Sequence, residues 1–242
     1  MKIKTVLGLL CAVPFFGWAQ PDSLDLYLLP GQGGDHRLFN NFAPEGPYRL
    51  HHIVYHRPAR RQTLREYARE LSVQIDTTRR FVIIGVSLGG MFATELSTLL
   101  PDERTIVISS AKNRTELPAQ YRFQRHVPVY KLVPPRVARF GAKVLQPLVE
   151  PDRRHEAATF RAMLRDKDPV FLRRTIQMLI QWERTDTPPG VYAIHGGRDH
   201  TVPVRNVDYD YLLADGSHMI VLTRGAEVSR LVEQALRADA DQ

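Results

Sequence analysis

The sequence predicts an α/β fold in which helices flank a mostly parallel sheet and a helical cap is inserted into the core. Short apolar runs alternate with amphipathic segments, a pattern typical of parallel strands joined by right-handed crossovers. One of these runs, residues 81–84, leads into Ser87, which has a glycine two residues before it and two residues after it. A helical segment follows. The alternation stops at residues 114–185, which we assign to the cap, and then resumes.

Size and composition are those of one sizeable domain. With 242 residues, the chain is long enough to bury a substantial core. Hydrophobic residues make up 43% and charged residues 24% of the chain, as in ordinary globular proteins. The sequence contains no repeat or low-complexity tract, so a folded globular domain is expected.

Residues 1–19 are predicted to be a signal peptide and not part of the fold. Lys2 and Lys4 precede an apolar stretch that is too short to span a bilayer comfortably. Small residues up to Ala19 favour cleavage after it, so the protein is expected to be exported, either to the periplasm or as a secreted protein. A retained membrane anchor is the alternative. Cleavage would remove Cys11, the only cysteine, and with it any disulfide or cysteine-based metal site.

The first strand after this segment is expected at residues 25–30, followed by a glycine-rich loop. The loop, Gly31-Gln32-Gly33-Gly34, lacks the Gly-Lys-Ser/Thr of a phosphate-binding loop and the glycine spacing of a dinucleotide site. Glycines allow the backbone to approach a substrate closely. We therefore expect the backbone N–H of Gln32 to donate to a substrate oxygen; a flexible structural turn is the alternative.

A second strand is expected at residues 49–55 and a helix at residues 63–75. The helix carries a mostly helical stripe of apolar residues, namely Leu64, Tyr67, Ala68, Leu71 and Val73. In a strand, His51 and His52 point to opposite faces and cannot bind one ion together. We therefore expect these histidines to be structural or exposed and not to be metal ligands.

The run at residues 81–84 predicts a strand buried on both faces. It leads into a Gly-x-Ser-x-Gly turn around Ser87 and a helix at residues 91–100. A nucleophilic serine in a tight turn requires this strand–turn–helix context, since a Cβ at either glycine would collide with a neighbouring element. The N–H of Leu88 would then lie at a helix N-terminus, where it can stabilise negative charge.

Residues 105–110 predict another buried strand, which ends in Ser109 and Ser110. In a parallel sheet, ligands bind beyond the C-terminal ends of the strands. Gln32, Ser87 and these two serines all fall at that edge. We therefore expect the functional site there.

The predicted cap, residues 114–185, is rich in proline and in apolar residues. Within it, Asp168 and Pro169 suit the N-cap and the first position of a helix that continues over residues 171–182. Six apolar residues are candidates either to line a pocket or simply to pack the cap: Phe123, Tyr130, Phe140, Leu145, Phe160 and Met163.

The net charge of +7 is concentrated in the predicted cap, which holds 15 Lys and Arg against 7 Asp and Glu. A basic patch can attract nucleic acid, anionic lipid or an acidic substrate. Here the basic residues are scattered over expected helical faces, and no nucleic-acid motif accompanies them. We expect a solvated cationic surface without a nucleic-acid partner, and keep lipid or nucleic-acid binding through the cap as a further hypothesis.

Three elements complete the predicted core: strands at residues 191–195 and 209–213 and a helix at residues 226–238. Asp199 follows the first of these strands on a loop that can direct a carboxylate. His218 follows the last strand, in a loop that also contains glycine and serine.

Ser87, Asp199 and His218 together predict nucleophilic catalysis. A serine hydroxyl needs a base, and the base needs a group that orients it. We expect His218 to take the Ser87 proton and return it to the leaving group, while Asp199 fixes the imidazole tautomer. The backbone N–H groups of Leu88 and Gln32 are the expected donors to the oxyanion.

His195 and His200 are alternative bases, and Asp215 is an alternative carboxylate. Neither histidine follows the last strand, so both are expected to be structural. Asp215 is too close in sequence to His218 to orient its far nitrogen easily. No metal and no organic cofactor are implied by these residues.

These motifs resemble those of the α/β-hydrolase-fold serine hydrolases, the esterase- and lipase-like family, over residues 24–238. The matching segments are Gly-Val-Ser-Leu-Gly-Gly at the serine, Ile-His-Gly-Gly-Arg-Asp-His-Thr-Val-Pro at the acid and Asp-Gly-Ser-His-Met at the histidine. One departure is Pro30, where many members have histidine in a His-Gly pair. The resemblance implies an α/β-hydrolase core at residues 24–113 and 186–238, with the cap at residues 114–185.

The resemblance implies an exported serine hydrolase that cleaves a carboxylic ester or thioester of a small molecule through an acyl-enzyme on Ser87. Because the family also contains acyltransferases and non-catalytic members, two alternatives stay open. One is an acyltransferase that uses the same three residues, and the other is a small-molecule-binding protein that has lost catalysis. No membrane span is expected once the signal peptide is removed, whereas association with a membrane surface stays open.

Overall fold

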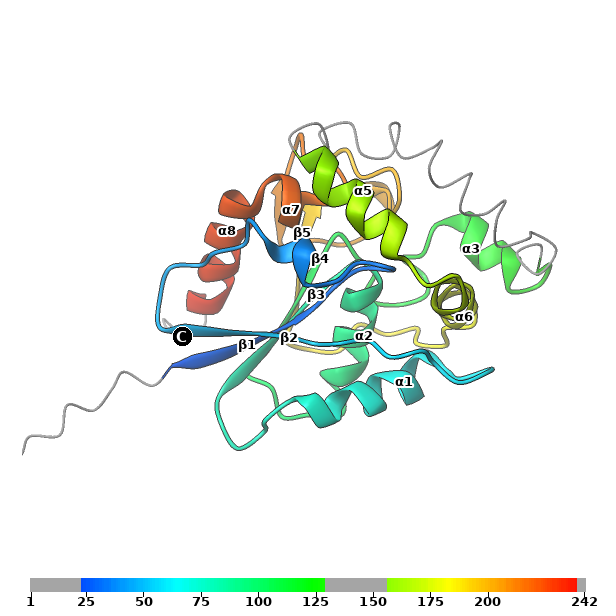
Figure 1. Ribbon diagram of the computed structural model, residues 1–242, viewed down its shortest axis with the longest axis horizontal. Helices are drawn as coiled ribbons and strands as arrows, with labels where there is room; N and C mark the ends of the chain where they lie inside the picture. The colour runs from blue at the N-terminus through cyan, green and yellow to red at the C-terminus, as the bar shows by residue number, and fades with distance from the viewer. Residues whose placement is uncertain (1–22, 129–155, 239–242) are drawn as a thin grey trace, which may run out of the picture.

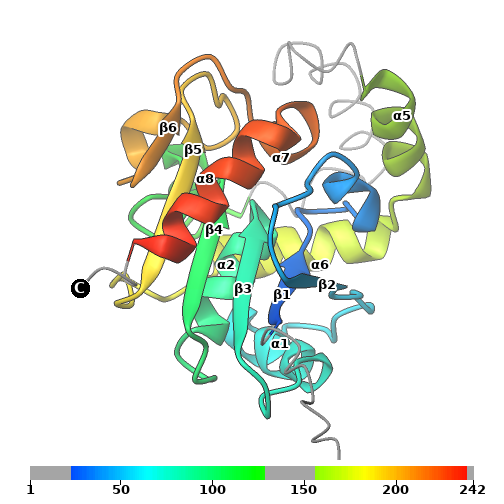
Figure 2. The ribbon, with the colours of Figure 1, turned by 90° about the vertical axis from the view of Figure 1, so that its left-hand side faces the viewer.

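Six parallel strands form one sheet in the computed structural model, which describes residues 23–128 and 156–238. The strand order is β2-β1-β3-β4-β5-β6, and helices lie on both faces of the sheet (Figure 2). The predicted α/β architecture with a parallel sheet is therefore confirmed. The expected signal peptide and three candidate pocket residues, Tyr130, Phe140 and Leu145, lie outside the described residues.

The strands are short and mostly separated by helices, as the alternating pattern predicts. They are β1 (Leu24–Leu29), β2 (Tyr48–His52), β3 (Phe81–Val86), β4 (Arg104–Ile108), β5 (Val191–Gly196) and β6 (Tyr211–Leu213). The α-helices are α1 (Leu64–Leu71), α2 (Leu88–Leu96), α3 (Ala119–Gln124), α5 (Ala157–Asp166), α6 (Pro169–Ile180), α7 (Ile220–Thr223) and α8 (Gly225–Arg237). Short 3₁₀-helices lie at His36–Phe39, Ser72–Gln74 and Val204–Asn206.

The sheet has an apolar core on each face, because side chains alternate along every strand. On β1, Tyr27 and Leu29 pack on the side of α1, α2 and α6, whereas Leu26 and Leu28 pack on the side of α7 and α8. Figures 1 and 2 show α1 and α2 on one side of the sheet and α8 on the other. Both faces of the central strands are therefore buried, as their continuous apolar sequence predicts.

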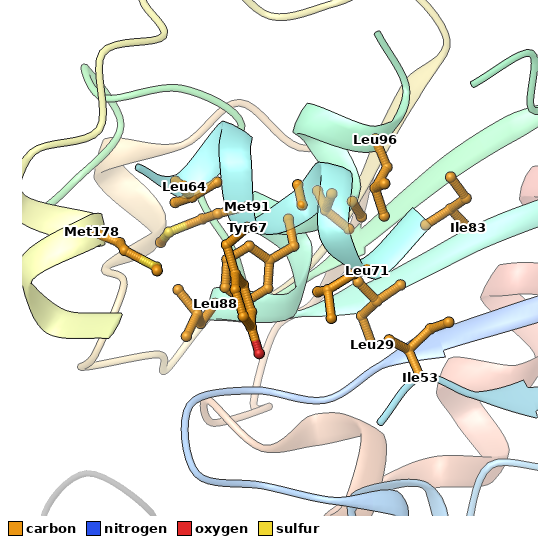
Figure 3. Packing of buried hydrophobic residues seen from close by; sticks show 14 of the residues in the cluster. Leu29, Ile53, Leu64, Tyr67, Leu71, Ile83, Leu88, Met91, Leu96 and Met178 are labelled. Atoms are coloured by element: carbon orange, nitrogen blue, oxygen red, sulfur yellow. The ribbon is translucent and has the colours of Figure 1, made fainter. Parts of the chain in front are cut away.

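The core on the α1 side is close-packed around a buried tyrosine (Figure 3). Tyr67 of α1 is fully buried among Met91 of α2 and other members of this cluster. Its hydroxyl donates to the carbonyl oxygen of His56 at 2.7 Å, so burial leaves that polar group satisfied. This packing holds α2, and with it the turn that precedes α2, against the sheet.

The second predicted strand and the first predicted helix end earlier than expected. The strand expected at residues 49–55 ends at His52, because the N–H and C=O of Val54 bond to the side chain of Gln74 at 2.9 and 3.0 Å and not to a strand. The helix expected at residues 63–75 is an α-helix only to Leu71 and continues as 3₁₀-helix. Val73, which we expected on the apolar stripe, is therefore 85% exposed.

Helix α2 begins earlier than the expected residues 91–100, directly after the serine turn, and ends at Leu96. The carbonyl oxygen of Ser87 accepts the N–H groups of Gly90 and Met91 at 2.9 and 3.2 Å, so the first helical turn starts at the serine itself. The start of the helix is thus tied to the turn that shapes the candidate site.

The described part of the predicted cap is helical and consists of α3, α5 and α6. Asp168 is the N-cap of α6 and Pro169 its first residue, as predicted. Phe160 and Met163 of α5 are buried, whereas Phe123 of α3 is 59% exposed. Among the helices that the structure describes, none is both long and apolar enough to cross a membrane.

Candidate active site

The chain changes direction across the sheet between β1 and β3. Strand β2 lies on one side of β1 and β3 lies on the other, so the connections that leave the C-terminal ends of β1 and β3 diverge. Such a switch point leaves a crevice at the edge of an α/β sheet, where ligands bind. The predicted site residues Gln32 and Ser87 follow these two strands closely.

Ser87 occupies a strained turn between β3 and α2. Its φ of 54° and ψ of −119° lie outside the regions that residues with a side chain ordinarily adopt, at a cost of about 1–3 kcal/mol. Its N–H donates to the carbonyl oxygen of Ile108 at 2.9 Å, and its own carbonyl oxygen accepts from Ser110 Oγ at 2.6 Å. Strand β4 and its following residues therefore hold the turn. Leu88, the first residue of α2, presents an N–H that has no intrahelical partner.

Gly85 and Gly89 allow the strand and the helix to approach each other, as the sequence predicts. A Cβ on Gly85 would lie 2.2 Å from the carbonyl oxygen of Gly89, and a Cβ on Gly89 would lie 2.2 Å from the carbonyl oxygen of Leu29. Backbone atoms cannot rotate out of such contacts as a side chain can. Gly85 is therefore needed for the close approach of α2 to β3, and Gly89 for the close approach of α2 to the end of β1.

Three of the predicted residues, Ser87, His218 and Asp199, form a hydrogen-bonded series. His218 Nε2 lies 2.9 Å from Ser87 Oγ, and His218 Nδ1 lies 2.7 Å from Asp199 Oδ2. Asp199 follows β5 and His218 follows β6, so loops at one edge of the sheet bring them to the serine. The other carboxylate oxygen, Oδ1, accepts the N–H groups of Thr201 and Val202 at 2.8 Å each. Both oxygens of the Asp199 carboxylate therefore have hydrogen-bond partners that hold it in place.

The surroundings of Asp199 assign the protons on His218. Burial acts to raise the pKa of Asp199, but the electrostatic interaction and hydrogen bond with His218 and the N–H of Val202 outweigh it, so this pKa lies below its ordinary value. Asp199 is ionised at neutral pH and only accepts hydrogen bonds. His218 must then carry its proton on Nδ1, which leaves Nε2 as the acceptor for the Ser87 hydroxyl.

His195, one of the alternative bases, supports the carboxylate loop. It is almost fully buried, and its Nε2 lies 2.8 Å from the carbonyl oxygen of Val202 and 3.5 Å from Asp199 Oδ2. Burial lowers the pKa of His195 below its ordinary value, so the imidazole is neutral at neutral pH. Its position favours the structural role expected from the sequence.

The other two alternative residues also have different surroundings. His200 is exposed to solvent, and Asp215 forms an ion pair with Arg224. Of the three histidines considered as the base, His218 is the one that the structure places in hydrogen-bond contact with Ser87.

The glycine loop after β1 lies beside Ser87. A Cβ on Gly31 would be only 3.3 Å from the Cβ of Ser87. The side chain of Gln32 turns toward α6, where its Nε2 donates to Thr175 Oγ1 at 2.9 Å and to the carbonyl oxygen of Leu172 at 3.2 Å. Helix α6 therefore anchors the loop that carries the predicted backbone donor.

Sequence reasoning did not identify Thr175. Its side chain is fully buried, and its hydroxyl donates to the carbonyl oxygen of Phe171 at 2.9 Å while it accepts from Gln32. Thr175 lies 143 residues from Gln32, and a threonine inside a helix has no local pattern that marks a distant contact. Only the fold reveals that it positions the loop.

A hollow of about 210 Å³ lies beside the same loop. Its walls include Gly33 and Gly34 of the loop, Tyr55, Phe171 of α6 and the stem of Lys167. A Cβ on Gly33 would be 2.8 Å from the Lys167 stem, so the two are in close contact. Burial lowers the pKa of Lys167 below its ordinary value. The hollow gives a small molecule room next to the glycine loop.

Comparison with known proteins relates this geometry to one family. The sequence profile of the family described as "Alpha/beta hydrolase family" matches residues 24–236. A comparison with curated protein sequences gave no match.

Several solved structures share the fold. An enol-lactonase from Burkholderia xenovorans LB400 superposes with a TM-score of 0.66 at 15% sequence identity, covering 89% of this chain and 92% of that one. A thermophilic esterase from Thermogutta terrifontis gives 0.63 at 15% identity, covering 88% and 89%. A lipase-esterase related protein from Clostridium acetobutylicum ATCC 824 gives 0.61 at 13% identity, covering 87% and 93%. At such low identities the likeness establishes the fold and not the reaction.

Proposed function

Since the chain belongs to the α/β hydrolase family, we propose that it is a serine hydrolase that cleaves a carboxylic ester or thioester through an acyl-enzyme on Ser87. The observation that carries this proposal is the hydrogen-bonded series of Ser87, His218 and Asp199, with contacts of 2.9 and 2.7 Å. The similar structures named as an esterase and a lactonase support an ester-like bond as the substrate.

In the proposed reaction, His218 Nε2 accepts the hydroxyl proton while Ser87 Oγ forms a bond to the acyl carbon. The carbonyl electron pair moves onto its oxygen and gives a tetrahedral oxyanion. Collapse of this intermediate breaks the bond to the alcohol or thiol, which receives the proton from His218 and leaves an acyl ester on Ser87. Water then repeats both steps and releases the acid. Asp199 keeps the imidazole oriented and stabilises its charged form.

The backbone N–H groups of Leu88 and Gln32 are the proposed donors to the oxyanion. The first lies at the N-terminus of α2, where the helix dipole favours negative charge. The second lies in the glycine loop, one residue after the glycine that contacts Ser87. Loss of one such donor typically lowers the rate by about 10²–10³-fold.

Thr175→Val is expected to lower kcat for ester hydrolysis by about 10–100-fold, an effect no larger than that of losing one oxyanion donor. Valine has a similar shape but cannot accept the hydrogen bond from Gln32 Nε2, so the loop loses the shorter of the two hydrogen bonds that hold it against α6. Steady-state hydrolysis of p-nitrophenyl acetate measures the change. Thr175→Ser, which keeps the hydroxyl, is the control and is expected to stay close to the wild type. Equal kcat for Thr175→Val and the wild type would show that the hydrogen bond between Thr175 and Gln32 does not contribute to catalysis.

Rapid-mixing hydrolysis of p-nitrophenyl acetate tests the proposed function. We expect a fast release of p-nitrophenol that approaches one equivalent per chain, followed by slower turnover, because deacylation of the Ser87 ester is the slower step for activated esters. A panel of esters, thioesters and lactones then identifies the preferred bond. Folded protein that cleaves no member of the panel would contradict the proposal and favour the binding-protein alternative. Preferential transfer of the acyl group to added alcohols would favour the acyltransferase.

A further inference from the structure

A basic hollow of about 490 Å³ lies between α6 and the loop that precedes α1. Four of its seven lining residues are arginines: Arg60 and Arg61 come from the loop, and Arg173 and Arg174 come from α6. The other three are uncharged, so no acidic side chain is among the described residues that line it.

The four guanidinium groups keep their charge uncompensated within the described part of the chain. The side chains of Arg60, Arg61 and Arg173 form no hydrogen bond or ion pair with another described residue. Arg174 Nη1 donates to the carbonyl oxygen of Pro58. A carbonyl oxygen positions a guanidinium group but does not neutralise it, so four positive charges face one volume.

The N-terminus of α6 lies at the hollow but offers an anion little, because the side chain of Asp168 accepts the N–H of Val170 at 2.9 Å and Pro169 has no N–H. A strained residue is a second feature of the hollow. Arg61 has a φ of 61°, a left-handed conformation that costs a residue with a side chain free energy. Residues with backbone strain of this kind are often found at ligand-binding sites.

We propose that this hollow binds a phosphate group. Like charges that crowd together repel each other, and a bound anion removes that repulsion and stabilises the folded chain. Guanidinium groups bind phosphate oxygens through paired, charge-assisted hydrogen bonds, which lysines cannot match. The volume of the hollow lies within the range of small-molecule sites.

The hollow is separate from the site at Ser87. Arg173 is exposed, whereas Thr175, the residue of α6 that anchors the glycine loop, is fully buried. The phosphate group could belong to a soluble phosphate compound or to the headgroup of an anionic lipid, and both present the same chemistry to the arginines. None of the seven residues that line the hollow belongs to the series of Ser87, His218 and Asp199, and binding is measured without ester hydrolysis, so either proposal can fail while the other stands.

The test uses two probes at physiological ionic strength. Calorimetry measures binding of inorganic pyrophosphate, and co-sedimentation measures binding to phosphatidylglycerol vesicles, with phosphatidylcholine vesicles as the neutral reference. The double variant Arg60→Ala/Arg173→Ala removes two charges from the hollow and is expected to stay folded, because neither side chain has a described partner. The matched control, Arg205→Ala/Arg230→Ala, removes two exposed charges outside the hollow.

At least one probe is expected to bind the wild type and to bind the hollow variant at least about tenfold more weakly, since charge-assisted hydrogen bonds are lost. The control variant is expected to change affinity by less than about twofold, because salt screens distant charges. Selective loss of pyrophosphate binding would identify a soluble phosphate compound as the source, and selective loss of vesicle binding would identify a lipid headgroup. Failure of both probes to bind the wild type, or equal losses in the two double variants, would overturn the proposal.

Discussion

Ser87→Ala is expected to lower kcat for p-nitrophenyl acetate by about 10⁵–10⁶-fold, because the acyl-enzyme can no longer form. The residual rate would come from the oxyanion donors and from binding alone. Alanine keeps the Cβ of serine, so the turn keeps its conformation and the protein is expected to stay folded. Steady-state hydrolysis, together with circular dichroism, measures both effects.

Ser97→Ala is the matched control for that experiment. It makes the same chemical change at the other end of α2, where the hydroxyl donates to the carbonyl oxygen of Thr94 at 2.9 Å. Its kcat is expected to equal that of the wild type. A Ser87→Ala protein that hydrolyses esters as fast as the wild type would show that another group is the nucleophile.

Asp199→Asn is expected to lower kcat by about 10⁴-fold with little change in structure. Its Oδ1 can still accept from Thr201 and Val202, so the new amide nitrogen takes the place of Oδ2 and faces His218 Nδ1. An amide N–H donates, which forces the proton of His218 onto Nε2, where it can no longer accept the Ser87 proton. The prediction is measured as the kcat of the folded variant.

Asp215→Asn is the control for this substitution, because Asp215 is an exposed carboxylate paired with Arg224. Its kcat is expected to stay near that of the wild type, and similar losses in the two variants would contradict the role of Asp199. Stability adds a second readout. Because folding lowers the pKa of Asp199, its contribution to the free energy of unfolding is present above its unfolded pKa of about 3.9 and is lost as the pH falls through the folded value.

The residues that sequence reasoning found have local patterns. Ser87 lies between glycines that are needed for backbone contacts, and Asp199 and His218 each follow a strand that a short apolar run identifies. Parallel strands end at the same edge of the sheet, so the convergence of the three side chains could be expected from the order of the elements. The left-handed φ of Ser87 agrees with the strained turn that the Gly-x-Ser-x-Gly motif predicts.

The features that sequence reasoning missed depend on contacts between distant segments. The side chain of Gln74 ends β2 early by bonding to Val54, and Thr175 anchors a glutamine far away in the sequence. The basic charge of the cap was expected to be scattered over its surface. The fold instead joins Arg173 of α6 with Arg60, which lies outside the predicted cap, so neither segment alone predicts the basic hollow.

The proposed hydrolysis requires that His218 activate the hydroxyl of Ser87 as a nucleophile. Labelling with a fluorophosphonate probe, followed by peptide mass spectrometry, tests it most directly, because the probe reacts covalently with activated serines. We expect a single label on Ser87 in the wild type and almost none in His218→Gln, in which the hydroxyl is still present. Ester hydrolysis by a wild-type protein that carries no label on Ser87, or full labelling of Ser87 in His218→Gln, would contradict it.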